Sequence, residues 1–312
     1  MNLSNGTTAS SFADDTRVQR GIAGEEDCEV LQQDLDSIYT WAEEVGMVFN
    51  AGKFKLLRFW LDRDSAPDIL YMAPDGGPIE EKDCLRDLGV RISTDLTFAN
   101  QIDMTVESGN RMSGWALRTF RRRGRYLMLT ILRSLIQPRL DYCSQLWSPR
   151  DQSSINRLEA VQRQFISNIR DPALQGLDYW QKLSHLRVYS QERRRERYQI
   201  CFLWKLSQGL IDGYQINWQW SDRRGRYAIP KTIPSSAPTK VRLARERSLA
   251  VHGAHIFNLL PINLRNENSR DFPLFKNNLD IFLVTVPDQP TITGLARAAA
   301  TNSLLDQILQ QD

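Results

Sequence analysis

Two adjacent aspartates near the start of the chain have the residue types and spacing of a divalent-metal site. Asp14 and Asp15 follow Phe12 and Ala13, inside a segment (residues 8–18) that the sequence predicts to be a hairpin. A hairpin turn would present both carboxylates beside a small side chain, and paired carboxylates suit two-metal nucleotidyl transfer. Adjacent aspartates are also common in solvated turns that bind nothing. The pair is therefore a candidate metal site only together with the segments that follow it.

The charge of the chain is unevenly distributed along the sequence. Residues 1–105 carry 9 Lys+Arg against 20 Asp+Glu, and residues 106–250 carry 27 against 11. Residues 251–312 carry 4 against 6, so the net charge of +3 conceals a basic middle segment between two acidic ones. A basic segment of this kind attracts the phosphate backbone of nucleic acids.

Arginine dominates this basic segment, and its guanidinium group binds phosphate oxygens through two parallel hydrogen bonds. Aromatic side chains lie between the arginine clusters and offer surfaces on which bases can stack, although we expect most of them to be buried in the core. Such clusters also occur as solvated helix faces or nuclear-import signals. The arginines that we select as nucleic-acid ligands are Arg121, Arg122, Arg123, Arg125, Arg193, Arg194, Arg195 and Arg197.

The spacing of apolar residues predicts an α+β chain whose first part contains the sheet. Residues 27–45 have apolar side chains at steps of three and four and are followed by Gly46, which predicts one helix that packs under the sheet. Residues 48–49 and 54–61 are predicted strands, residues 66–78 a Pro- and Gly-rich turn, and residues 84–92 a continuation of the sheet.

The pattern becomes helical after residue 98. We predict helices over residues 101–120, 125–136, 153–169 and 181–209, with Gly124, Pro138 and Pro149 as separators. Residues 212–240 contain three prolines and are predicted to be a linker or a long loop. Four parts result, namely residues 1–98, a basic helical part 99–211, the linker 212–240 and a small helical end 241–312.

Several other kinds of site and location are disfavoured by the sequence. The four cysteines are widely separated and the three histidines have no neighbouring ligand, which disfavours a zinc site and a disulfide framework. No run of about eighteen apolar residues and no signal peptide is apparent, so no membrane is expected as a partner. We expect an intracellular protein of the nucleus or cytoplasm that is not secreted.

The order of segments resembles the palm and thumb of reverse transcriptases from non-long-terminal-repeat (LINE-type, jockey-like) retrotransposons. Residues 12–16 resemble motif C of that family, residues 31–53 resemble motif D, and residues 85–98 resemble the primer-grip hairpin and the entry to the thumb. Further similarity covers the region beyond the palm. It lies in residues 137–143, 146–149 and 157–163, in Arg247-Ser248 and in Leu260-Pro261.

The resemblance implies a partial polymerase palm, an antiparallel sheet with a packed helix, followed by an all-α thumb and a C-terminal helical region. It makes Asp14 the essential ligand of Mg²⁺, Asp15 its neighbouring ligand, and Lys53 the catalytic lysine of motif D near the triphosphate. The implied partners are an RNA template and a DNA primer. Motif A, motif B and the fingers do not appear upstream of Asp14, so we expect the chain by itself not to extend a primer.

Two other readings remain open from the sequence. The chain could be a nucleic-acid-binding module without catalysis, because its middle segment is strongly basic. It could also be a decayed reading frame of a retroelement, in which case an incomplete sheet should expose strand edges and aggregate. No motif predicts the oligomeric state.

Overall fold

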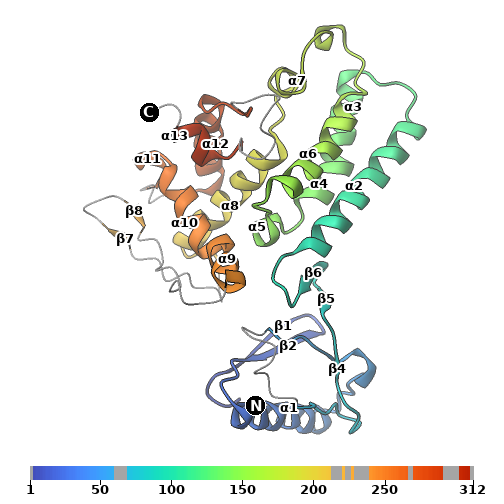
Figure 1. Ribbon diagram of the computed structural model, residues 1–312, viewed down its shortest axis with the longest axis vertical. Coiled ribbons are helices and arrows are strands. Elements are labelled where there is room, and N and C mark those ends of the chain that lie inside the picture. The colour runs from blue at the N-terminus through green and yellow to red at the C-terminus, as the bar shows by residue number, and fades with distance from the viewer. Residues whose placement is uncertain are drawn as a thin grey trace. The chain divides into compact units, whose positions relative to one another are not determined.

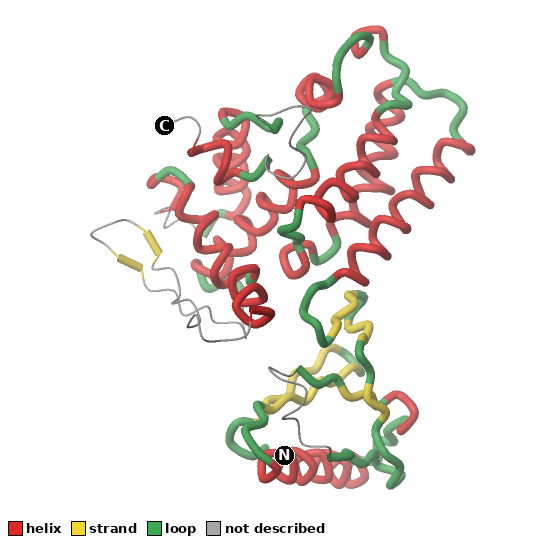
Figure 2. Tube along the Cα trace, in the orientation of Figure 1, coloured by secondary structure: helices red, strands yellow, loops and turns green. Residues whose placement is uncertain are grey.

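The structure is a computed structural model that divides into two compact units, Met1–Leu96 and Thr97–Asp312. The first unit contains α1 and β1 to β6, and in the second unit the described elements are helices together with the short strands β7 and β8 (Figures 1 and 2). Within the ranges that the structure describes, no helix combines the length and the apolar character that a membrane span requires. The described residues are 3–59, 69–211, 220–221, 226–227, 239–265, 270–290 and 302–309.

The predicted hairpin around the aspartates is confirmed. β1 (Thr7–Phe12) pairs antiparallel with β2 (Asp15–Arg20), with Thr7 opposite Arg20 and Phe12 opposite Asp15. Arg20 fixes this hairpin to the helix that follows, because its Nη2 donates to Oδ1 of Asp27 at 2.8 Å. The backbone N–H of Ala23 and the Arg20 guanidinium hold the pKa of Asp27 below its usual value.

The amphipathic helix predicted for residues 27–45 is confirmed as α1 (Glu25–Glu44). It ends before Gly46, whose φ of +72° is a left-handed conformation that glycine adopts without a steric cost. The apolar face of α1 packs into a small core with the chain around residues 69–79. The buried members of this core are Cys28, Tyr71, Ala73 and Ile79.

The strands predicted at residues 48–49 and 54–61 are largely wrong in the described part of the chain. Val48 is 97% exposed and lies in no strand. A 3₁₀ turn, η1 (Ala51–Lys53), then redirects the backbone, and only β3 (Lys55–Leu56) is extended and paired. Residues 60–61 lie outside the described residues.

The single antiparallel sheet expected for the palm is not formed within the described ranges, where strands pair only two by two. β3 pairs parallel with β4 (Glu80–Glu81), and β5 (Cys84–Asp87) forms a separate antiparallel hairpin with β6 (Val90–Ser93). The physical reason lies in β1 and β2, which have only one buried residue between them and so no apolar face on which a larger sheet could assemble. The α+β class holds.

The second unit begins with the helices that the apolar spacing predicts. α2 (Ala99–Thr119) packs against α6 (Gln152–Ile166), and the two run side by side in Figure 1. Pro138, a predicted separator, does not interrupt the helical backbone. The preceding turn is a π-helix, and this local widening lets the helix continue although proline has no backbone N–H to donate. The elements between α2 and α6 are α3 (Arg125–Ile131), the π-helical η3 (Leu132–Ile136), α4 (Gln137–Asp141) and α5 (Ser144–Trp147).

The helix predicted over residues 181–209 is wrong in its extent, because it is divided into α7 (Tyr179–Leu186) and α8 (Gln191–Ser207). Arg187 ends α7 in the left-handed region, with φ of +53°. Ser190 then begins α8, since its Oγ accepts a hydrogen bond from the backbone N–H of Arg193 at 3.1 Å. A short 3₁₀ turn, η4 (Pro172–Leu174), precedes α7.

The C-terminal helices share one apolar core with α8. Leu203 and Trp204 of α8 are fully buried together with Phe257 and Phe275. Most of the predicted linker lies outside the described residues. The C-terminal elements are β7 (Trp220–Ser221), β8 (Arg226–Tyr227), α9 (Thr239–Arg247), α10 (Leu249–Leu259), α11 (Ile262–Arg265), α12 (Phe272–Thr285) and α13 (Leu304–Leu309).

The contact between α8 and α10 requires a glycine, and this gives a first prediction. A Cβ atom at Gly253 would lie 2.7 Å from Cδ1 of the fully buried Leu203. We expect Gly253→Ala to lower the free energy of unfolding by about 1 kcal/mol or more, because overpacking outweighs the better helix propensity of alanine. Urea denaturation measures the change.

Gly114→Ala is the matched control, since Gly114 also lies inside a helix. Its added Cβ would meet only the flexible guanidinium of Arg118, with 3.2 Å to Nη1. That substitution should raise the free energy of unfolding by roughly 0.5–1 kcal/mol. Equal effects of the two substitutions would contradict the close approach of α8 and α10.

Candidate functional site

Asp14 and Asp15 lie at the tip of the β1–β2 hairpin, where both side chains are exposed. Ala13 occupies the turn with φ of +54°. A hydrogen bond of 2.9 Å between the hydroxyl groups of Ser11 and Thr16 closes the ladder below the turn. The tip therefore presents two neighbouring carboxylates to solvent, as the sequence predicts.

The donor set at the tip fits Mg²⁺ in one specific way. Among the described residues, no group of three or more Asp, Glu, His or Cys side chains is arranged to hold a metal ion. Mg²⁺ is commonly bound by one or two carboxylates and completes its octahedron with water and substrate phosphates. Asp14 and Asp15 therefore suit an ion that is shared with a phosphate-bearing substrate, and not a closed protein site.

Lys53 is exposed and lies at the end of η1, in the same unit as the hairpin. Within the described part of the chain, its side chain forms no ion pair or hydrogen bond with Asp14 or Asp15. The structure thus leaves Lys53 available for an anion and does not join it to the carboxylate pair.

The first predicted arginine cluster lies in the loop between α2 and α3 and at the first residue of α3, Arg125. Arg121 and Arg122 are exposed, whereas the other two arginines hold the loop in place. Arg123 Nη1 donates to Oδ1 of Asn168 at 2.7 Å, and Arg125 Nη2 donates to the carbonyl oxygen of His185 at 3.0 Å. Only Arg121 and Arg122 are free to approach a phosphate backbone without giving up these contacts.

The second predicted cluster, on α8, requires a correction. Arg193 and Arg195 are 0% and 1% exposed, so they cannot reach a nucleic acid. Arg193 Nη2 donates to the carbonyl oxygen of Pro287 at 2.9 Å, and Arg195 Nη1 donates to that of Gln191 at 3.0 Å. The physical reason is that α8 is surrounded by other helices, so alternate arginines of the run point into the unit.

One buried and one half-buried carboxylate accompany these two arginines, namely those of Glu196 and Glu192. Glu196 is buried, lies 3.8 Å from Nε of Arg193 and accepts the backbone N–H of Leu304 at 2.9 and 3.0 Å. Glu192 accepts the backbone N–H of Asn302 at 3.1 Å. Burial raises the pKa of both carboxyl groups, that of Glu196 to about 8. This part of α8 is therefore a structural cluster that holds the C-terminal segment.

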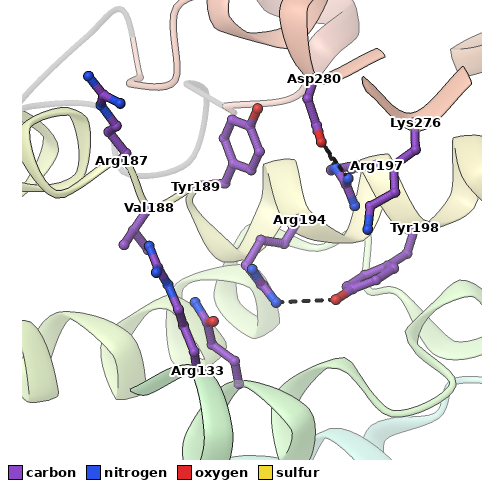
Figure 3. Close-up of a pocket in the computed structure, with 10 residues that line it drawn as sticks. Arg133, Arg187, Val188, Tyr189, Arg194, Arg197, Tyr198, Lys276 and Asp280 are labelled. Carbon is purple, nitrogen blue, oxygen red and sulfur yellow. Dashed lines mark hydrogen bonds and ion pairs between the residues drawn. The ribbon is translucent and has the colours of Figure 1, made fainter. Parts of the chain in front are cut away.

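Arg194 and Arg197 point instead to a concave site in the second unit, which we call the basic pocket (Figure 3). The cavity has a volume of about 490 Å³ and is bordered by η3, α8, α12 and the segment between α7 and α8. Its lining residues are Arg133, Gln137, Arg187, Val188, Tyr189, Arg194, Arg197, Tyr198, Lys276 and Asp280.

The two α8 arginines of the basic pocket are held by carboxylates. Arg194 pairs with Asp141 and donates to the hydroxyl of Tyr198 at 3.2 Å. Arg197 forms a two-pronged ion pair with Asp280, with 2.7 Å between Nη2 and Oδ2. Both guanidinium groups are thus fixed in position at the wall of the cavity.

Three further cations of the basic pocket have no such partner. In the part of the chain that the structure describes, the side chains of Arg133, Arg187 and Lys276 form no ion pair or hydrogen bond, and all three are exposed. The lining therefore has five cations and the single carboxylate of Asp280, with Asp141 behind Arg194. A cavity with this excess of positive charge concentrates anions.

Sequence reasoning missed these three cations because they are not clustered along the chain. Arg133 is a single arginine in an apolar helix, and Lys276 belongs to the acidic last segment. Arg187 carries one usable signal, since a non-glycine residue in the left-handed region is uncommon and such positions gather at functional sites. That signal becomes visible only in the structure.

Comparison with known proteins gives no relative from which a function could be transferred, so the function is inferred from the residues of this chain. The chain matches no protein-family model, no curated protein and no solved structure. Two features can carry chemistry in the described residues, namely a carboxylate pair at a hairpin tip and a cavity rich in cations. The first suits a divalent metal, and the second suits a phosphate group.

Proposed function

We propose that this chain is a palm and thumb segment of an RNA-directed DNA polymerase of the non-LTR retrotransposon type, and that its helical unit binds nucleic acid. The observation that carries the proposal is the hairpin with Asp14 and Asp15 at its tip, followed directly by the packed helix α1. Motif C of reverse transcriptases has this form. The basic pocket and the exposed Arg121 and Arg122 support the nucleic-acid part.

In this proposal Asp14 and Asp15 would hold Mg²⁺, and their ligand number leaves room for substrate phosphates. The ion would stabilise negative charge on the oxygens of a transferring nucleotide. Lys53 would add a positive charge near the triphosphate. An RNA template paired with a DNA primer would be the bound nucleic acid, and the cations of the helical unit would neutralise its backbone.

Binding to an RNA–DNA hybrid tests the proposal directly. We expect fluorescence anisotropy to show binding that weakens steeply with salt, with a slope of about −0.9 per neutralised phosphate in a plot of log affinity against log salt concentration. The affinity should fall for Arg121→Gln/Arg122→Gln, because both side chains are exposed and unpaired within the described residues. Absence of binding at low salt would overturn the proposal.

Electron paramagnetic resonance of Mn²⁺ added to the complex of protein and hybrid tests whether the hairpin tip binds a metal ion. We expect Asp14→Asn to weaken Mn²⁺ binding by about tenfold or more, since it removes one of two charged ligands. Glu43→Gln, which removes an exposed carboxylate of the same unit, is the matched control and should change nothing.

A second function, nucleic-acid binding without catalysis, is favoured by the absence of a third metal ligand among the described residues. The two functions differ in one result. Hybrid binding together with Mn²⁺ affinity that Asp14→Asn leaves unchanged would support the binding module and reject the metal site.

A further inference from the structure

We propose that the basic pocket binds a phosphate monoester, carried on the end of a nucleic-acid strand. This inference rests on the proposed function, in that it names the ligand of the helical unit. It goes further because a general basic surface binds any phosphodiester, whereas this cavity is built for a group of higher charge.

The charge of the basic pocket matches a dianion. A phosphodiester in the middle of a strand carries one negative charge, whereas a phosphate monoester carries close to two at pH 7 because its second pKa is about 6. Arg194 and Arg197 are already neutralised by Asp141 and Asp280, but Arg133, Arg187 and Lys276 have no carboxylate partner among the described residues. A ligand with two charges compensates most of this excess.

The donors come from separate elements that surround the cavity. Arg133 belongs to η3, Arg194 and Arg197 to α8, and Lys276 to α12, and Figure 3 shows their side chains around one open space. The terminal oxygens of a monoester can accept hydrogen bonds from several directions, and an arginine binds two of them at once. The ion pairs of Arg194 and Arg197 orient these donors before a ligand arrives.

A second hollow, lined by residues of α3 and η3, borders the basic pocket at their shared residue Arg133 and favours a strand over a free nucleotide. It has a volume of about 320 Å³, shares Arg133 with the basic pocket, and is lined also by Tyr126, Leu129, Thr130 and Ser134. Tyr126 is 88% exposed, so its ring is available to a base. Positions 126, 130 and 133 lie on one helix face, and a strand whose terminal phosphate occupies the pocket can extend along it.

Three oligonucleotides of one sequence test the inference by fluorescence anisotropy. One carries a 5′-phosphate, one a 3′-phosphate and one hydroxyl groups at both ends. We expect one of the phosphorylated strands to bind about tenfold more tightly than the hydroxyl strand, since a charge-assisted hydrogen bond contributes roughly the free energy of one decade in affinity. Adenosine monophosphate serves as competitor.

Two matched variants separate the pocket from general charge attraction. Arg133→Gln/Lys276→Gln should abolish the preference for the phosphorylated strand, and among the described residues neither side chain has an ion-pair or hydrogen-bond partner that its loss would disturb. Arg121→Gln/Arg122→Gln removes the same charge outside the pocket and should weaken the binding of the phosphorylated strand and of the hydroxyl strand by the same factor. A preference that persists in the pocket variant would overturn the inference.

The remaining outcomes are also decisive. Equal binding of all three strands by the unaltered protein would overturn the phosphate-monoester inference and leave the proposed function intact. Absence of binding to any strand or hybrid would overturn both the inference and the proposed function. Tyr126→Ala should weaken the phosphorylated strand without affecting adenosine monophosphate. If adenosine monophosphate competes with an affinity equal to that of the phosphorylated strand, the pocket binds phosphate monoesters but its ligand is a free nucleotide, which would overturn the assignment to a strand end.

Discussion

Replacing Trp204 by alanine should lower the free energy of unfolding of the helical unit by about 3–5 kcal/mol, which is a large part of the stability of an ordinary domain. Trp204 is fully buried at the centre of the core that α8 shares with the C-terminal helices. Its ring stacks on Phe275, with ring centroids 4.6 Å apart and an interplanar angle of 14°. Truncation would leave a cavity between α8 and α12, and urea denaturation measures the loss.

Trp115→Ala is the control for this prediction. Trp115 lies on α2 in the same unit but is 46% exposed, and its ring contacts Phe120 edge to face with 6.1 Å between centroids. We expect its loss to cost about 1 kcal/mol, because exposed aromatic surface contributes little. Similar losses for the two tryptophans would show that the packing of α8 against α12 is not as described.

The elements that the sequence predicted well are those fixed by local patterns. Apolar steps of three and four identify α1, α2 and α6, and the Asp14-Asp15 turn between two polar runs identifies the β1–β2 hairpin. Each of these depends on residues within one or two turns of each other. The helical break at Arg187 was missed because the left-handed backbone there replaces the glycine that would signal it.

The predicted palm sheet failed for a different reason, since pairing between strands depends on which faces are apolar. Residues 84–92 do form strands, but Leu88 and Gly89 both have positive φ and fold them back on each other as a tight hairpin. Local β-propensity predicted the strands and gave no information about their partners. The strand pairing of the described residues is therefore a tertiary property.

The candidate site likewise has a part that the sequence predicts and a part that depends on tertiary packing. Arginine clusters are visible in the sequence, but the sequence alone did not distinguish the half-buried Arg194, which lines the basic pocket, from the fully buried Arg193 and Arg195. That distinction depends on the helices that cover α8. The basic pocket was not predictable at all, because Arg133 and Lys276 are far apart in the chain and only the packing of η3 and α12 around α8 brings them to one cavity.

Stability should fall as the pH rises from about 5 to 9, because two buried glutamates prefer their protonated forms. Burial raises the pKa of Glu159 to about 7, partly offset by hydrogen bonds from Tyr179 and the backbone N–H of Gln191. Burial and the charge of Glu192 raise the pKa of Glu196 to about 8. The native state therefore binds protons that the unfolded state, with pKa values near 4.5, has already released.

The difference between the folded and unfolded pKa values decides whether stability rises or falls with pH. A carboxyl group whose pKa is raised by folding contributes its full stability below about pH 4.5, and that stability is lost as the pH rises through the folded value. For Glu196 the loss is on the order of a few kcal/mol between pH 5 and 9, since each pKa unit corresponds to about 1.4 kcal/mol. Thermal unfolding at a series of pH values measures the slope.

Glu196→Gln should flatten this slope, because an amide has the shape of the acid but does not ionise. Its Oε1 can still accept the backbone N–H of Leu304, so the C-terminal segment keeps its contact with α8. Glu107→Gln, on the exposed face of α2, should leave the slope unchanged. A flat profile for the unaltered protein, or an unchanged slope in Glu196→Gln, would mean that Glu196 is paired as a carboxylate and that the buried cluster of α8 is a neutralised ion network.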